Sequence, residues 1–229
     1  MSRLLALICL AAAVCVLLAA CGEDDESPAG GATAQDESTP APTPEAGCES
    51  VKAPEPQPDG DLSKPKLELD ATKDYVATIE TSCGDFQITL DVERAPRTGG
   101  SFVSLARTRF FDDGVFHRIV PDFVIQGGDP TGTGMGGPGY SVTEAPPKDL
   151  AYTKGVVAMA KTEAEPAGTS GSQFYVVTGA DANLPPDYAL LGEVTEGMEV
   201  VERIGTVPAE ADGRPADPVV IRSVRVKVD

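Results

Sequence analysis

The sequence predicts a mainly β domain, a closed barrel or a sandwich, with two short helices and a long non-globular segment before it. Short apolar runs with strand-like alternation recur between turn signals from about residue 72 onward. Only two stretches have helical character, and the 24 glycines and 20 prolines disfavour long helices. Before residue 72 the chain is first apolar and then acidic and rich in proline.

Residues 1–20 have the pattern of a signal peptide, with Arg3, an apolar run over 4–18 and a small-residue end. The run is too short to span a bilayer comfortably. The end, Leu18-Ala19-Ala20-Cys21, resembles the lipobox of bacterial lipoproteins. That resemblance implies cleavage before Cys21, a diacylglycerol on its sulfur and a further acyl chain on its amine, which together anchor stably. We expect a lipid-anchored protein on the extracytoplasmic side of the cell membrane. An ordinary secreted protein with a chance cysteine is the alternative.

Residues 21–70 contain 13 acidic and 3 basic residues, and almost no aromatic ones. The proline-rich runs at 38–44 and 54–58 favour extended, polyproline-like chain. Such a composition cannot bury enough apolar surface to fold. We therefore expect an acidic, disordered tether that leads into a globular domain over residues 71–229. A proline-rich ligand for a recognition module is an alternative without supporting detail.

The five cysteines fall into three groups. Cys9 and Cys15 leave with the signal peptide, and Cys21 carries lipid. Cys48 and Cys83 remain as an even pair in an oxidising compartment, which predicts a disulfide between the tether and the domain. In the chain-entropy account, a loop of this length stabilises the fold by about 3–4 kcal/mol. Two free thiols are the alternative.

The domain begins with two predicted strands, 76–80 and 86–90, around a turn at 82–85, and apolar residues alternate in the second strand. A short helix opens at Ala95-Pro96 with Phe102 and Leu105 on its buried side, although Gly99-Gly100 weakens it by about 1 kcal/mol per glycine. A second short helix covers 200–204. Further strands are expected at 115–120, 124–127, 156–160, 173–177, 190–194 and 219–228.

The bulk charge and the single histidine exclude several functions. A formal net charge of −18 argues against nucleic-acid binding, which depends on neutralising phosphates. His117 alone argues against His-based zinc sites, and no strained elbow motif supports a hydrolase built on His117 and Ser172. Residues 132–137 fit G-x-G-x-x-G, but Pro130 and Pro138 flank them and leave no helix N-terminus for a pyrophosphate.

Several longer motifs occur in one order along the domain: Phe116-His117-Arg118, then FVIQGGD at 123–129, GTGMGGPG at 132–139, Met159-Ala160, GSQF at 171–174 and LGEV at 191–194. On these motifs the chain resembles the cyclophilins, a family of peptidyl-prolyl cis/trans isomerases, over essentially all of residues 75–228. The resemblance implies a closed eight-stranded antiparallel barrel capped by two short helices. It also implies catalysis without a covalent step, cofactor or metal.

The resemblance assigns roles to individual residues. Arg118 matches the catalytic arginine and acts with Gln126, which holds the substrate backbone, and with Phe123. The pocket for the proline ring is implied to comprise Phe123, Val124, Tyr175 and Leu184, while Ala160, Gln173 and His117 complete the substrate groove. Taken singly, each apolar residue is more readily explained by core packing and Arg118 by a surface ion pair; only their joint spacing favours a site.

These observations predict a membrane-tethered, monomeric isomerase that acts on proline-containing segments of exported proteins and accelerates their folding. A proline-peptide binding module or chaperone-like holdase with incidental turnover is the alternative, and a structural surface lipoprotein is a third. Three segments depart from the family pattern: 99–101, 161–168 with two extra residues, and 182–188. Tyr175 also replaces a phenylalanine, and its hydroxyl is expected to shift substrate preference.

Overall fold

The computed structural model describes residues 47–66 and 68–229, which fall in one compact unit. The predicted signal peptide, the lipidation of Cys21 and the first part of the predicted tether lie outside the described residues. Neither helix of the described part has the length and apolar character needed to cross a bilayer.

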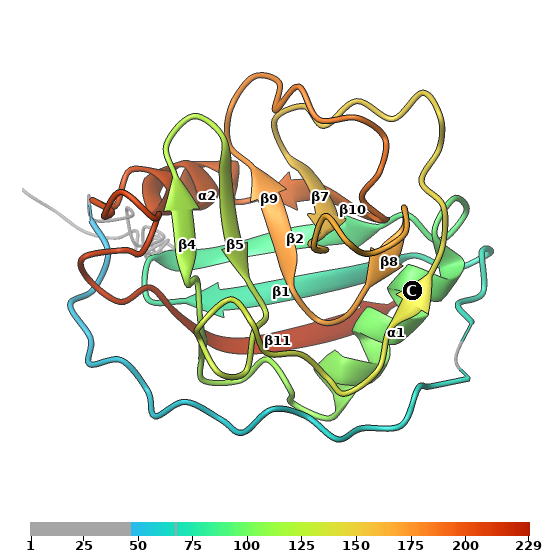
Figure 1. Ribbon diagram of the computed structural model, residues 1–229, viewed down its shortest axis with the longest axis horizontal. Coiled ribbons are helices and arrows are strands. Elements are labelled where there is room, and N and C mark those ends of the chain that lie inside the picture. Colours follow the sequence, from blue (N-terminus) through green and yellow to red (C-terminus); the bar gives the residue numbers. More distant parts are fainter. Residues whose placement is uncertain (1–46, 67) are drawn as a thin grey trace, which may run out of the picture. The chain divides into compact units, whose positions relative to one another are not determined.

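The fold is mainly β with two helices, as the sequence predicts (Figure 1). The elements are β1 Tyr75–Thr81, β2 Gly84–Leu90, α1 Pro96–Arg107, β3 Gly114–Val115, β4 Arg118–Val120, β5 Val124–Gly127, β6 Val142–Thr143, β7 Val156–Met159, β8 Thr169–Ser170, β9 Phe174–Val177, β10 Leu190–Glu196, α2 Met198–Gly205 and β11 Val220–Val228. Nine strands form one antiparallel sheet in the order β3-β11-β1-β2-β10-β7-β9-β5-β4, and β6 pairs separately with β8.

The sheet is an open half-barrel, which corrects the prediction of a closed eight-stranded barrel. The expected strand 115–120 is divided into β3 and β4, which pair with different partners: β3 with β11, and β4 with β5. Between them the Phe116 N–H donates to the Val219 carbonyl at 2.9 Å, and the chain then crosses to the other edge of the sheet. The two edges are therefore joined by the chain itself, and no ladder pairs β3 with β4 in the described residues.

The half-barrel has an apolar cluster on each face, and the register of β5 shows how the faces separate. Ile125 is fully buried in the main core, opposite Ile119 on β4 and Val176 on β9. Its neighbours Val124 and Gln126 point to the other face, because successive strand residues alternate. A second, smaller cluster lies on that face, formed by Val124, Tyr152, Ala158, Tyr175, Val177 and Ala182.

Both predicted helices are present and pack as expected. In α1 a proline occupies the first turn, and Phe102 and Leu105 are 0% and 1% exposed. Gly99 of this helix lies against Leu69, whose Cδ1 is 2.9 Å from the place a Cβ would occupy. The absence of a side chain at Gly99 therefore lets Leu69, from before the domain, approach α1 closely.

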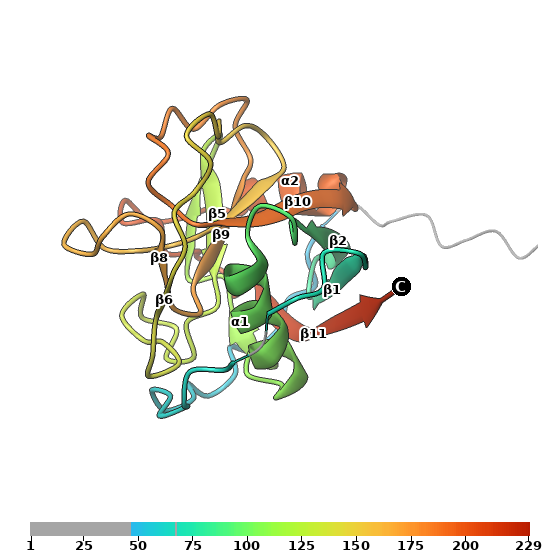
Figure 2. The same ribbon diagram turned by 90° about the vertical axis from the view of Figure 1, so that its right-hand side faces the viewer.

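Residues 47–66, which we call the strap, lie as extended chain against the domain (Figures 1 and 2). Backbone bonds fix it along its length: Glu49 N–H donates to the Ser82 carbonyl at 2.7 Å, Gln57 N–H to Pro130 at 2.9 Å and Gly60 N–H to Gly137 at 2.9 Å. The prediction of a disordered tether is therefore wrong for the strap. The composition indicated correctly that the strap cannot form a hydrophobic core of its own. The strap is held in place by backbone hydrogen bonds to the domain.

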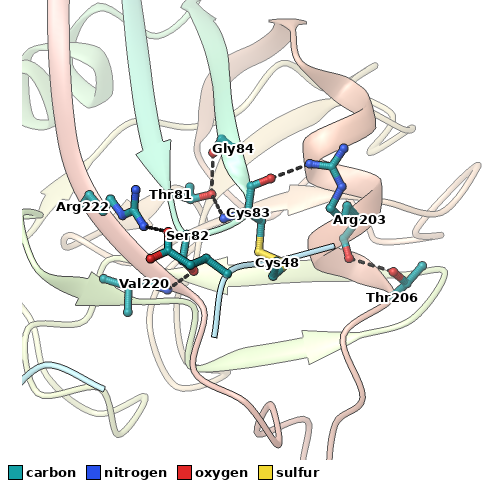
Figure 3. The surroundings of a disulfide bond; sticks show 10 residues. Cys48, Thr81, Ser82, Cys83, Gly84, Arg203, Thr206, Val220 and Arg222 are labelled. Carbon is teal, nitrogen blue, oxygen red and sulfur yellow. Dashed lines mark hydrogen bonds and ion pairs between the residues drawn. A yellow bond between two sulfur atoms is a disulfide. The ribbon is translucent and has the colours of Figure 1, made fainter. Parts of the chain in front are cut away.

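The strap begins at a disulfide between Cys48 and Cys83, which confirms that predicted pairing. Figure 3 shows the bond at the turn between β1 and β2, where the Arg203 guanidinium of α2 donates to the Cys83 carbonyl at 2.5 Å. Glu49 and Arg222 form an ion pair beside it. The start of the strap is thus attached both covalently and by polar contacts.

Candidate functional site

A cavity of about 310 Å³ opens on the face of the half-barrel that carries the second apolar cluster. Its lining combines one guanidinium, one ammonium and one amide with an apolar and aromatic wall. The lining residues are Arg118, Phe123, Val124, Gln126, Ala160, Lys161, Tyr175, Leu184 and Tyr188. Six of the predicted proline-pocket and groove residues, together with Arg118, are therefore brought together in one place.

Strand register explains why the polar groups meet the aromatic wall. Arg118 on β4 is the cross-strand partner of Gln126 on β5, and Gln126 is the partner of Tyr175 on β9. Directly opposed residues project from the same face with their Cβ atoms about 5 Å apart. The register thus places a cation, an amide and a phenol ring in one row.

Arg118 is positioned at the edge of the cavity and is not neutralised there. Its Cζ lies 5.9 Å from the centroid of the Phe123 ring. Among the residues that the structure describes, no acid forms an ion pair with it. Its N–H groups can therefore turn toward a ligand in the cavity.

A chain of amides orients Gln126. The Gln173 Nε2 donates to the carbonyls of Gly134 and Gly136, at 3.0 and 2.9 Å. Its Oε1 therefore serves as the acceptor for the Gln126 Nε2 at 2.9 Å. This arrangement leaves the Gln126 carbonyl oxygen to accept an N–H from a bound peptide backbone.

The apolar wall rests on three tyrosines. Tyr175 is 4% exposed, and its ring centroid is 5.7 Å from that of Tyr188. The Tyr152 hydroxyl donates to the Tyr188 carbonyl at 2.6 Å and accepts the Tyr188 N–H at 3.0 Å. Burial raises the pKa of Tyr152 to about 12 and raises the pKa of Tyr175 further, so both phenols stay neutral.

Sequence reasoning missed Lys161, Tyr188 and Tyr152 as parts of this site. Lys161 is 4% exposed and forms an ion pair with Asp187 at 2.6 Å. Its ammonium also lies 5.4 Å from the centroid of the Tyr188 ring. The pair ties together 161–168 and 182–188, the two segments that depart from the family pattern. That departure was the signal available in the sequence, but spacing alone did not connect the segments.

A second hollow of about 430 Å³ adjoins the first and shares Gln126, Ala160 and Lys161 with it. Gln173 lines this second hollow, together with residues 134–138 of the glycine loop, by which we mean residues 132–139. The predicted groove residue Gln173 is therefore placed beside the first cavity and joined to it through Gln126.

His117 lies away from the first cavity, in a smaller one of about 180 Å³ shared with Arg118, Gln126, Asp212 and Arg214. Both ring nitrogens are buried and find no hydrogen-bond partner among the described residues. Burial lowers the pKa of His117, and the nearby Arg118 adds to this while Asp129 opposes it. The imidazole is therefore neutral, and it does not line the 310 Å³ cavity.

The chemistry of the site is that of binding and electrostatic stabilisation. The lining of the 310 Å³ cavity contains no serine, cysteine or carboxylate. No cluster of histidine, cysteine and acidic residues that could hold a metal occurs in the described part of the chain. What remains is a small apolar pocket with one guanidinium outside any ion pair of the described residues and one amide acceptor at its rim, since the Lys161 ammonium is paired with Asp187; this suits a ring-bearing, uncharged peptide segment.

Comparison with known proteins identifies the family of the chain. The family described as cyclophilin type peptidyl-prolyl cis-trans isomerase/CLD matches residues 76–226. A peptidyl-prolyl cis-trans isomerase A from Mycobacterium tuberculosis is 39% identical over 167 residues, covering 66% of this chain and 91% of the relative. A Neurospora crassa isomerase-like protein is 41% identical over 152 residues, covering 65% and 91%.

Solved structures of the same type also match. A cyclophilin type isomerase from Cryptosporidium parvum, crystallised in the presence of the dipeptide Ala-Pro, superposes with a TM-score of 0.62 at 28% identity. The match covers 66% of this chain and 98% of the other.

Proposed function

This chain belongs to the cyclophilin family and is a peptidyl-prolyl cis-trans isomerase, and we propose that Arg118, Gln126 and the apolar cavity carry out its reaction. The observation that supports these roles most directly is the position of Arg118. Its guanidinium stands at the rim of an apolar cavity beside Phe123, and no acid in the described residues neutralises it.

The reaction needs only rotation about one bond. Amide resonance sets a barrier of about 18–20 kcal/mol, and X-Pro exchange takes tens to hundreds of seconds without a catalyst. When the bond twists, resonance is lost and the proline nitrogen regains its lone pair. A guanidinium N–H that donates to this nitrogen stabilises the twisted state more than either planar isomer, which is the condition for catalysis.

The remaining residues hold one side of the bond while the other side turns. The proline ring enters the cavity against Phe123, Val124 and Leu184, where burial of apolar surface retains it. The Gln126 oxygen accepts a backbone N–H of the substrate. Because the amide network fixes this oxygen in advance, little reorganisation is required as the bond rotates.

We further infer that the substrates are X-Pro segments of exported proteins and that the enzyme acts while tethered to a membrane. The lipobox-like sequence before Cys21 supports the tether. The Cys48–Cys83 disulfide supports an oxidising, extracytoplasmic compartment. In that setting, slow proline isomerisation limits the folding of secreted chains.

The roles are tested by comparing wild type with Arg118→Ala in a proline-isomerisation assay. One hydrogen bond from a charged group contributes about 1.5–3 kcal/mol, so kcat/KM should fall about ten- to a hundredfold. Binding of a prolyl peptide, measured by titration, should weaken much less. Arg118→Lys is the matched control that keeps the charge. Equal turnover by wild type and Arg118→Ala would show that Arg118 is not catalytic.

A further inference from the structure

Backbone hydrogen bonds join the strap to the glycine loop (Figures 1 and 2). The Leu62 N–H donates to the Pro138 carbonyl at 2.9 Å, and Gly60 bonds Gly137 at the same distance. In return, the Gly137 N–H donates to the Asp59 carboxylate at 2.8 Å. Strap and loop are thus bonded in both directions over a few residues.

The contact at Gly60 leaves no space for a side chain. A Cβ at this position would lie 2.9 Å from the Gly137 carbonyl oxygen and equally close to the Pro138 backbone. Backbone atoms cannot swing aside as the end of a side chain can. Only glycine allows the strap to approach the loop this closely.

The glycine loop needs such support from outside. Gly132, Gly134 and Gly139 have φ values of 67°, 85° and 88°, and glycine-rich chain has little intrinsic preference for one conformation. On the inner side, the Asp129 carboxylate accepts the N–H groups of Thr131 and Thr133, at 2.8 and 3.0 Å. The outer side of residues 137–138 is held by the strap.

The glycine loop in turn positions the side-chain amides of Gln173 and Gln126 in the site. The carbonyls of Gly134 and Gly136 accept hydrogen bonds from the Gln173 Nε2, and the Gln173 Oε1 accepts one from the Gln126 Nε2. The same loop residues line the 430 Å³ hollow beside the proline cavity. A shift of residues 137–138, which the strap contacts, would therefore change the shape of this hollow directly, whereas Gln126 is reached only indirectly, through Gln173 and its partners Gly134 and Gly136.

We propose that Asp59 and Gly60 are positioning residues for substrate binding: through the glycine loop, the strap sets the affinity for peptides long enough to lie over the adjoining hollow. This rests on the proposed roles of Gln126 and the cavity. A substrate that occupies only the proline cavity depends on the strap much less, because the residues of that cavity do not touch the strap's partners directly.

The test measures kcat and KM on the full-length protein for two substrates, a short Ala-Pro peptide and a longer peptide extended on both sides of the same bond. Asp59→Ala removes one hydrogen bond, and Gly60→Val forces the strap away from the loop. Asp61→Ala and Ser63→Val are matched controls, because both positions are exposed residues of the same strap. Hydrogen exchange of the Gly137 amide reports directly on the contact.

For the longer peptide, Asp59→Ala should raise KM about two- to tenfold, the effect of losing one hydrogen bond, and Gly60→Val should raise it at least as much, while kcat and the KM of the short peptide stay near wild type. Exchange at Gly137 should accelerate only in the test variants. An equal effect on both peptides, or none on either, would overturn the proposal. Absence of turnover in wild type with the short peptide would instead count against the catalytic roles.

Discussion

At the scale of single residues, Tyr175 differs from what its sequence context suggested. A tyrosine in a family phenylalanine position was expected to place a hydroxyl at the edge of the pocket and shift substrate preference. In the structure the ring lines the cavity, but the hydroxyl is buried and finds no protein partner among the described residues. We therefore expect the Tyr175 hydroxyl to affect the stability of the protein more than its substrate preference.

Tyr175→Phe should stabilise the protein. A buried hydroxyl without a partner costs about 1–3 kcal/mol, and phenylalanine keeps the packing on Tyr152 and Tyr188. Urea unfolding should show a higher free energy of unfolding, with KM for prolyl peptides essentially unchanged. Tyr152→Phe is the matched control: it removes a hydroxyl that makes two hydrogen bonds and should destabilise. A loss of stability in Tyr175→Phe would contradict the prediction.

His117 should make the stability of the protein depend on pH. Its pKa in the folded state lies below the usual 6.5, because the neutral ring is buried. As pH falls below about 6.5, the unfolded chain binds a proton that the folded chain resists, so the free energy of unfolding decreases. His117→Gln should flatten this dependence between about pH 7 and 5.

The attribution to His117 is clear for two reasons. It is the only histidine in the chain. The buried Asp129 has a pKa below 3.8, because hydrogen bonds from Thr131 and Gly134 outweigh the effect of burial, and it therefore titrates at lower pH. Unfolding curves of wild type and His117→Gln with the same pH slope would show that another group dominates.

At the scale of elements, the disulfide that begins the strap should contribute strongly to stability. Cys48 and Cys83 are 35 residues apart, and in the chain-entropy account closing such a loop stabilises the fold by about 3–4 kcal/mol. Cys48→Ser should lower the free energy of unfolding by about this amount. The exposed Glu49–Arg222 pair beside it adds little.

Reductant provides the control for this prediction. Reduced wild type should match Cys48→Ser in urea unfolding, and reductant should leave the variant unchanged. If oxidised wild type and Cys48→Ser unfold at the same urea concentration, the bond does not contribute to stability and the prediction is wrong.

Local patterns predicted most of the strands and both helices, and the misses have physical causes. Alternation identified β2, where Phe86, Ile88 and Leu90 are buried and the residues between them are not. Strands β6 and β8 have only two residues each, which is too short for an alternation of apolar and polar residues to be recognised. The division of 115–120 into β3 and β4 depends on which edge of the sheet each half pairs with, and the local sequence carries no sign of that.

The candidate site was predictable where motif and strand period coincide. Arg118, Gln126 and Tyr175 share a face through their register, and each lies in a recognisable motif. Lys161 and Asp187 meet only because two loops fold together, so their sequence separation concealed the pair. The strap was misjudged because proline and acid content report on core formation but not on backbone hydrogen bonds made to another segment.

At the scale of the whole molecule, the proposed lipid anchor and the observed disulfide require the same compartment. The lipobox-like end of the signal peptide implies acylation at Cys21 after export. The Cys48–Cys83 bond requires an oxidising environment, which export also provides. Two features encoded in separate segments thus lead to a single expectation for where the enzyme works.

Cys21→Ala should separate anchoring from folding and activity. Without the thiol no diacylglycerol can be attached, so the variant should leave the membrane fraction and the detergent phase, where the wild type should be found. Because the domain and its disulfide begin beyond the anchor, the exported variant should keep its isomerase activity and show no alkylatable thiols at Cys48 and Cys83. Cys15→Ala, a change within the signal peptide, is the control and should remain membrane-bound. Fractionation that finds wild type and Cys21→Ala equally in the soluble fraction would contradict lipidation and leave ordinary secretion as the explanation of the disulfide.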